Sequence, residues 1–211
     1  MTEKRPPLPP PERPFLNVPN LITLARILLT PLFVFSLVNG QRGTAFAVLV
    51  AAGVTDLMDG FAARRLKQRT RIGYWLDPAA DKLMITAAFV ALTIPALAAP
   101  HTLPVWLTAV VIGRDVIIAL GAGIVILVRG SRIFPPSLAG KFSTVFQVLT
   151  VWATTFELAW DGSAGWLPPL YLLTAALTCL SGALYMLRGF RMLGEPKAAP
   201  QGAPDITGPA E

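Results

Sequence analysis

Long apolar segments alternate with short polar or basic segments along most of this 211-residue chain. Each apolar segment is close to the roughly 20 residues that an α-helix needs to cross a bilayer. None shows the strict alternation that is typical of a β-strand, and a spanning backbone must satisfy its own hydrogen bonds. The pattern therefore predicts an all-α integral membrane protein with six transmembrane helices, near residues 20–40, 44–65, 77–99, 104–128, 140–161 and 166–188.

The two ends of the chain are polar and rich in proline. Such segments bury too little apolar surface to fold alone. No apolar stretch follows the first charges closely enough for a signal peptide. We expect a disordered cytoplasmic tail over 1–16, a six-helix transmembrane domain over 17–191, and a second disordered cytoplasmic tail over 192–211.

The composition agrees with a membrane location. Hydrophobic types make up 54% of the chain and charged types 14%, whereas a soluble domain carries about 25% charged residues. This leaves too little polar surface to cover a globule in water. The composition excludes a cytosolic enzyme, a disordered regulator and a disulfide scaffold.

The net charge of +6 comes from Lys and Arg residues that gather before the first segment, in alternate loops and after the last segment. The opposite loops hold only Arg42 and His101 as basic types, and Glu157 and Asp161 lie near the outer end of the fifth segment, where we expect both to be solvated. Basic loops stay cytoplasmic, so we expect a multi-pass protein of the inner (cytoplasmic) cell membrane with both termini cytoplasmic. Aromatic platforms for bases are missing beside these charges, which argues against a nucleic-acid partner.

Acidic residues cluster at the facing ends of the second and third segments. Asp56 and Asp59 are three apart and share a helix face, as do Asp77 and Asp81, four apart. A glycine lies four residues from each pair, so a bulky ligand can approach the backbone there. A short basic turn joins the two segments, and we expect antiparallel neighbouring helices on which the four carboxylates converge. The glycines are Gly60 and Gly73.

Four like charges at a membrane edge require a positive partner. Carboxylate oxygens suit hard cations such as Mg²⁺ or Mn²⁺, and the single histidine, His101, lies on the other side, so zinc is not expected. A cation held this way keeps positions open for substrate phosphates, with Arg64 as a nearby phosphate partner. The alternative for each acidic pair is a solvated helix end or an ion pair with the Arg-rich turn. Because the acidic pairs lie at the ends of the segments that flank a basic, cytoplasmic loop, we expect the active site on the cytoplasmic side.

The run from 56 to 81 reads D-x2-D-G-x2-A-R-x8-G-x3-D-x3-D. This resembles the signature of the CDP-alcohol phosphatidyltransferases. The segment from Asn17 to Arg26 resembles the opening of the phosphatidylglycerophosphate synthase and CMP-forming cardiolipin synthase branch. The blocks Gly113-Arg114-Asp115 and 140–144 resemble later parts of that branch, so the likeness covers about 17–190.

The resemblance implies a six-helix transmembrane homodimer that transfers a phosphatidyl group from CDP-diacylglycerol to a glycerol-type alcohol and releases CMP. It implies that Asp56, Asp59 and Asp77 bind metal, that Asp81 completes a site for two ions, and that Asp81 is the candidate general base. A carboxylate fully engaged by metal is a poor base, so one less committed carboxylate is needed near the acceptor hydroxyl. The resemblance also implies a CDP pocket formed by Gly60, Ala63, Arg64 and Gly73 beside Asp56. Asn20 is a further candidate to face the nucleotide, and it is equally suitable as a helix N-cap.

The acceptor is suggested by two basic residues within or beside apolar segments, Arg114 and Lys141. Such residues can hold an acceptor phosphate, which favours glycerol 3-phosphate. The alternatives are snorkelling to the interface or pairing of Arg114 with Asp115. The sequence Arg114-Asp115-Val resembles the cardiolipin synthases, whose acceptor is phosphatidylglycerol, so that acceptor stays an alternative.

Two other classes of membrane protein use intramembrane acids. A transporter would place charges near mid-bilayer, with interrupted helices in two repeats, whereas these acids cluster at one edge. An aspartate-rich prenyltransferase also combines acidic pairs, Mg²⁺ and a diphosphate, and Asp77 with Asp81 alone fits it. That class needs more than six spans and acidic motifs far apart in the sequence.

Overall fold

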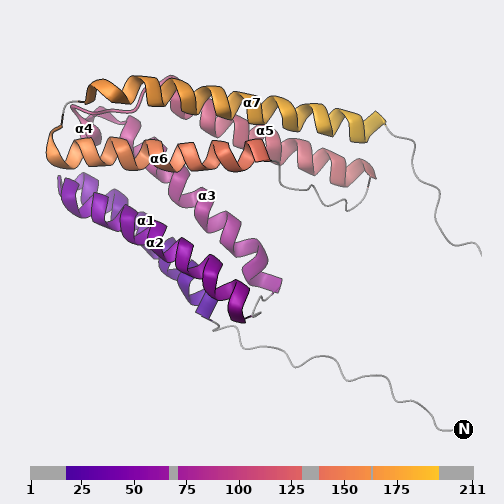
Figure 1. Cartoon of the computed structure of the whole chain (residues 1–211), viewed down its shortest axis with the longest axis horizontal. Coiled ribbons are helices and arrows are strands. Elements are labelled where there is room, and N and C mark those ends of the chain that lie inside the picture. The colour runs from indigo at the N-terminus through magenta and orange to yellow at the C-terminus, as the bar shows by residue number, and fades with distance from the viewer. Residues whose placement is uncertain (1–17, 67–70, 130–137, 163, 195–211) are drawn as a thin grey trace, which may run out of the picture.

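The computed structural model describes residues 18–66, 71–129, 138–162 and 164–194, and these ranges are almost entirely helical (Figure 1). Six helices have 21 or more residues, and a four-residue helix and a 3-10 turn lie between them. The elements are α1 (Val18–Val38), α2 (Arg42–Leu66), α3 (Arg71–Thr93), α4 (Pro95–Ala98), α5 (Val105–Arg129), α6 (Leu138–Trp160), η1 (Ala164–Trp166) and α7 (Leu167–Gly194).

The six long helices match the six apolar segments, with differences at their ends. Helix α3 begins at Arg71, six residues before the predicted segment, because backbone hydrogen bonds continue through polar positions that a count of apolar residues leaves out. It ends at Thr93 because Pro95 has no N–H for the helix ladder and starts α4 instead. Helix α7 continues to Gly194, so the tail predicted from 192 begins too early. The tail over 1–16 lies outside the described residues.

The turn between α1 and α2 shows how a short sequence reverses the chain. Gly40 has φ of +69°, which suits a residue without a Cβ. The Gln41 N–H donates to the Ser36 carbonyl at 2.8 Å, and the Gly40 N–H donates to the Leu37 carbonyl at 3.0 Å. These two bonds form a Schellman motif, which satisfies the last carbonyls of α1. Helix α2 then runs back beside α1.

The helices form two groups that meet at one end of the molecule (Figure 1). Helix α1 packs along both α2 and α3, and α7 packs along both α5 and α6, while α6 also contacts α2 and α3. We call the end with the segments 39–41, 94–104 and 161–166 the loop end, and the opposite end the motif end. The groups diverge toward the motif end. Helix α1 packs on both α2 and α3 and so joins them. The prediction that α2 and α3 are antiparallel neighbours concerns their facing ends, whose side chains lie outside the described residues, and it stays a prediction.

The apolar core lies in the loop-end half of the bundle, as far as side chains are described. Its most deeply buried members come mainly from the end of α1, the second half of α3, the 94–104 segment, the start of α5 and the end of α6. This half therefore has the dense packing of a protein interior. The largest buried apolar side chains are Phe33, Phe89, Leu92, Leu103, Leu107 and Leu158.

Polar contacts also connect the segments at the loop end. Arg42 donates to the Ala99 carbonyl at 2.8 Å and forms an ion pair with Asp161 at 3.1 Å. Glu157 is buried, and its carboxylate accepts a 2.6 Å hydrogen bond from the Trp166 indole. The expectation that Glu157 is solvated is wrong, because the α6–α7 connection folds back over it. Gly162 lies against this carboxylate, which occupies the space that a Cβ there would need.

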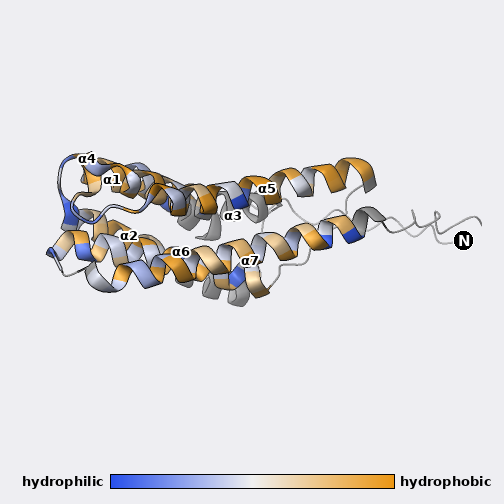
Figure 2. Cartoon of the chain, turned by 90° about the horizontal axis from the view of Figure 1, so that it is seen from above, coloured by the Kyte–Doolittle hydropathy of each residue, from blue (hydrophilic) through white to orange (hydrophobic). Residues whose placement is uncertain are grey.

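Two helices are long and apolar enough to cross a membrane within the described part of the chain, Val105–Val128 and Leu167–Arg191. Only 11% and 28% of these stretches are buried, whereas the core helix of a soluble protein is mostly buried. Figure 2 shows apolar residues along most of α5. Large apolar side chains are exposed on the outside of the bundle, as lipid contact requires. The count of six spans is not confirmed and stays a prediction; α6 is less apolar because several of its residues form a polar face.

Candidate functional site

The acidic motif lies on two helices that share α1 as a neighbour. Positions 56, 59, 60, 63 and 64 are on α2, and positions 73, 77 and 81 are on α3. Their side chains lie outside the described part of the structure, so convergence of the carboxylates stays a prediction. Among the side chains that are described, no three His, Cys, Asp or Glu residues form a metal cluster.

Asn20 lies inside the first turn of α1, which begins at Val18. An N-cap residue precedes the first helical residue, so the alternative that Asn20 caps this helix is wrong. Its side chain is outside the described set, and the expectation that it contacts CDP stays a prediction.

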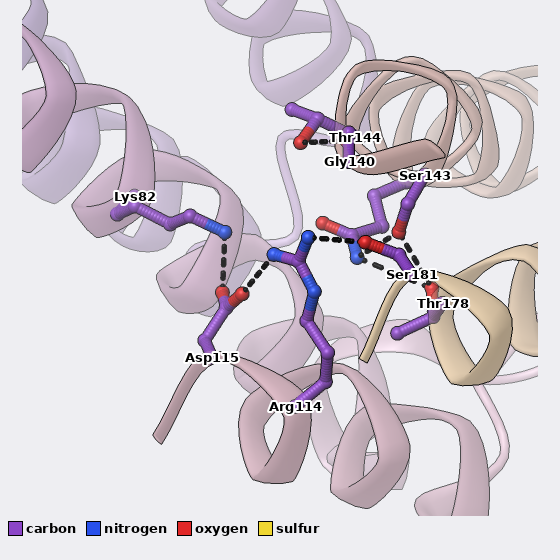
Figure 3. Close-up of polar contacts among 9 residues, drawn as sticks. Lys82, Arg114, Asp115, Gly140, Ser143, Thr144, Thr178 and Ser181 are labelled. Atoms are coloured by element: carbon purple, nitrogen blue, oxygen red, sulfur yellow. Dashed lines mark hydrogen bonds and ion pairs between the residues drawn. The ribbon is translucent and has the colours of Figure 1, made fainter. Parts of the chain in front are cut away.

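Lys82 directly follows Asp81 and joins α3 to α5. Its Nζ lies 2.5 Å from Oδ2 of Asp115, and Arg114 Nη1 donates to Oδ1 of the same carboxylate at 2.8 Å (Figure 3). One carboxylate thus lies between two cations, and the three side chains carry a net charge of +1. Such an excess of positive charge attracts an anion.

Arg114 is held inside the bundle. Its Nη2 donates to Ser181 Oγ at 2.7 Å, and only 11% of its side chain is exposed. Gly182 makes room for it, because a Cβ at Gly182 would lie 3.3 Å from Arg114 Cγ. The structure therefore contains the pairing with Asp115 that the sequence offered as an alternative. The buried Arg114 Nε has no partner among the described groups.

Lys141 is exposed on α6, and no described contact brings it to Arg114. The sequence reasoning selected Lys141 and missed Lys82. The signal for Lys82 was present, since it is a charged residue within an apolar segment, where charges are costly and functional by default. Lys82 was overlooked because it directly follows Asp81, and attention went to the carboxylates of the motif.

A polar seam runs between α6 and α7, and the sequence reasoning also missed it. Ser143, Thr150 and Thr154 meet Thr178, Thr174 and Tyr171 with oxygen–oxygen distances of 3.1, 2.7 and 3.1 Å. The Gln147 amide donates to Ser143 and Thr178 at 3.2 and 3.3 Å. The polar residues on each of the two helices are three or four positions apart in the sequence, which predicts that they lie on one face of their helix. The seam ends at Ser181, one turn after Thr178, and so connects to Arg114 (Figure 3).

An apolar cavity of about 400 Å³ lies among α1, α2, α3 and α6. Its wall includes a buried charge, Arg26, and the Trp152 indole, which lies on Gly53. Position 56 follows Gly53 by three residues on α2, and position 81 precedes Met84 by three on α3. Because residues three apart share a helix face, the cavity begins about one turn from the acidic motif. The remaining wall residues are Leu49, Ala52, Met84, Ile85, Ala88, Thr144, Val145, Val148, Leu149 and Val151.

Relatives with assigned names are similar to most of the chain. A CDP-diacylglycerol–glycerol-3-phosphate 3-phosphatidyltransferase of Aquifex aeolicus is 30% identical over 185 residues, which cover 84% of this chain and 98% of the relative. The Escherichia coli K12 protein of the same name is 35% identical over 178 residues, covering 81% and 93%. A CMP-forming cardiolipin synthase of Streptomyces coelicolor is 35% identical over 163 residues, covering 74% and 70%.

The family model for the CDP-alcohol phosphatidyltransferases matches residues 16–185. This range includes the acidic motif on α2 and α3, the Lys82–Asp115–Arg114 cluster and the α6–α7 seam. The family resemblance stated from the sequence is thereby confirmed. The chain belongs to the CDP-alcohol phosphatidyltransferase family.

Proposed function

We propose that this chain transfers the phosphatidyl group of CDP-diacylglycerol to a glycerol-type acceptor and releases CMP, with glycerol 3-phosphate as the acceptor. The observation that carries the proposal is the surplus positive charge of Lys82, Asp115 and Arg114, beginning one residue after Asp81. It supports an anionic acceptor at the motif. Family membership favours this reaction over the transporter and prenyltransferase alternatives.

The acidic motif fits a divalent cation. Asp56 and Asp59 share one face of α2, and Asp77 and Asp81 share one face of α3, while α1 packs on both helices. All four are oxygen donors of the kind that Mg²⁺ and Mn²⁺ prefer. We infer a site for two ions held by Asp56, Asp59, Asp77 and Asp81. Bound there, the ions would neutralise the diphosphate and the departing CMP.

The remaining motif residues have roles around that site in our proposal. Asp81 accepts the proton of the acceptor hydroxyl as that oxygen attacks the phosphorus beside diacylglycerol. Asn20, Asp56, Gly60, Ala63 and Gly73 line the CDP pocket. Arg64 pairs with a phosphate there, because its guanidinium matches phosphate oxygens in a bidentate way.

Arg114 is the proposed anchor of the acceptor phosphate. The buried Nε of Arg114 is a free donor within the described surroundings, and the adjoining Lys82 adds a second positive charge. Lys141, which the sequence suggested, stays a proposed contact near the entrance. Phosphatidylglycerol also carries a phosphate, and the similarity to a CMP-forming cardiolipin synthase keeps this lipid as a second candidate acceptor.

We further propose that the protein is a homodimer in the inner (cytoplasmic) membrane, with six spans per chain. Six crossings place both termini, the basic loops and the motif end on the cytoplasmic side. Soluble glycerol 3-phosphate then reaches the motif from the cytoplasm, while the lipid substrate stays in the bilayer.

CMP release tests the proposal directly. The purified full-length protein is incubated with CDP-diacylglycerol and Mg²⁺ or Mn²⁺, and with glycerol 3-phosphate, phosphatidylglycerol, inositol phosphate or serine in parallel reactions. We expect CMP and phosphatidylglycerophosphate only with glycerol 3-phosphate, and none with EDTA. Release only with phosphatidylglycerol would establish the cardiolipin synthase instead. No release with any acceptor, from folded and metal-loaded protein, would contradict the reaction class.

A further inference from the structure

The cavity among α1, α2, α3 and α6 has the shape and chemistry of a site for an amphipathic ligand. Thr30 Oγ1 lies 3.3 Å from Met84 Sδ, which aligns α1 with α3. Arg26 is one turn before Thr30 and is therefore at the end of the cavity nearest position 81. Deeper in the bundle the wall consists of side chains such as Leu49, Ala88 and Trp152. The cavity thus has the charged side chain of Arg26 at the end nearest the acidic motif, and apolar side chains along most of the remaining wall.

The size of the cavity matches part of a lipid tail. A cavity of roughly 150 Å³ holds one benzene ring, so the cavity of about 400 Å³ has room for on the order of a dozen carbons. Its wall on α6 extends from Thr144 to Trp152, about 12 Å at 1.5 Å per residue. An extended hydrocarbon chain fits this length better than a compact polar ligand does.

We propose that this cavity holds one acyl chain of the CDP-diacylglycerol substrate, and that the contact of Trp152 with Gly53 limits how much hydrocarbon enters. This inference rests on the function proposed above. A Cβ at Gly53 would overlap Cζ2 of the Trp152 indole. The indole can therefore approach α2 this closely only because residue 53 has no side chain. Trp152 forms a wall of the cavity, and a change at either residue alters the space inside.

The pair offers substitutions with opposite effects. Trp152→Ala removes the indole and enlarges the cavity, so longer acyl chains should be favoured. Gly53→Ala forces the indole away from α2 and into the cavity, so shorter chains should be favoured. The double variant removes the overlap and should behave like Trp152→Ala. Alanine is a better helix former than glycine, so Gly53→Ala does not weaken α2 by itself.

The test supplies an equimolar mixture of dilauroyl and dipalmitoyl CDP-diacylglycerol with glycerol 3-phosphate to the full-length protein in nanodiscs, and mass spectrometry measures the product ratio. We expect the ratio of long to short product to rise about fivefold in Trp152→Ala and to fall by a similar factor in Gly53→Ala. This is below the discrimination of a pocket in water, because lipid outside the protein is as apolar as the cavity. Trp106→Ala, an exposed tryptophan on α5 outside the cavity, should leave the ratio unchanged.

A second measurement separates this inference from the proposed function. Native mass spectrometry gives the ratio of the two CDP-diacylglycerols that remain bound to each variant without turnover. Opposite shifts in bound ratio without CMP release would sink the proposed reaction and support the acyl cavity. CMP release with unchanged ratios in both variants would overturn the acyl cavity and mean that the tails lie in bulk lipid.

Discussion

The loop end and the motif end of the bundle differ in how their helices are held together. At the loop end, Phe33, Phe89 and Leu92 form a dense apolar core, and Arg42 connects segments from three parts of the chain. Toward the motif end the two helix groups diverge (Figure 1), an apolar cavity with one buried arginine opens among four helices, and a charged cluster around Asp115 lies between the two ends. Among the described side chains, buried apolar packing is concentrated at the loop end, and the proposed binding groups lie in the region where the helices diverge.

The strongest test of this division removes the charges of the motif. Asp56→Asn, Asp59→Asn and Asp77→Asn should each lower kcat by at least roughly 10²–10³-fold, the scale for one preorganised electrostatic contact. The melting temperature in detergent should stay close to that of the unchanged protein. Asp161→Asn is the matched change at the loop end and should leave CMP release near normal, because Asp161 only pairs with Arg42 on the surface. Near-normal turnover in an Asn variant of the motif would remove that residue from the proposed site.

A core substitution at the loop end should have the reverse effect. Phe89 is fully buried, and Phe89→Ala should lower the free energy of unfolding by about 3 kcal/mol, through lost contacts and the cavity left behind. Thermal unfolding in detergent measures the loss. Turnover per folded molecule should change little at low temperature. A large fall in kcat without loss of stability would show that the two ends are not separate in function.

The cluster around Asp115 lies between the two ends and should affect the acceptor. Arg114→Ala and Lys82→Ala should raise the KM for glycerol 3-phosphate by roughly tenfold to a hundredfold, as expected for a lost hydrogen bond to a charged group. The KM for CDP-diacylglycerol should change much less. Lys141→Ala should have a smaller effect than Lys82→Ala, because Lys141 is exposed and Lys82 contacts Asp115. The opposite order would favour Lys141, which the sequence suggested, over Lys82 as the second contact of the acceptor phosphate.

The smallest effect is expected from the polar seam. Thr150→Val removes the 2.7 Å contact with Thr174 while keeping the side-chain shape, and should destabilise the protein by about 0.6 kcal/mol. The midpoint of unfolding in SDS measures it, and a double-mutant cycle with Thr174→Val isolates the contact. Thr155→Val is the control, since the hydrogen bond described for Thr155 Oγ1 goes to the Val151 carbonyl of its own helix. Equal losses at 150 and 155 would show that the seam adds nothing beyond local bonds.

The sequence alone predicted those features of the two ends that depend on local patterns of residues. Apolar segments of about 20 residues predicted all six long helices, and Asp56, Asp59, Asp77 and Asp81 lie on helices at the expected spacing. Tertiary contacts were less predictable. Lys82 and Asp115 are 33 positions apart, and nothing in either segment specifies their approach. The contacts of α1 with both α2 and α3 were likewise not specified by any local pattern.

The polar seam has a consequence for how the chain enters a bilayer during synthesis. The buried hydroxyls and amide of α6, at Ser143, Gln147, Thr150 and Thr154, find their partners on α7. Polar groups on a lone helix oppose its partition from the translocon into lipid. Only a few residues separate Trp160 from Leu167, so α7 emerges soon after α6. In the proposed six-span topology the two helices can therefore leave the translocon as a hairpin with their hydrogen bonds already formed, so that α6 does not enter the lipid alone.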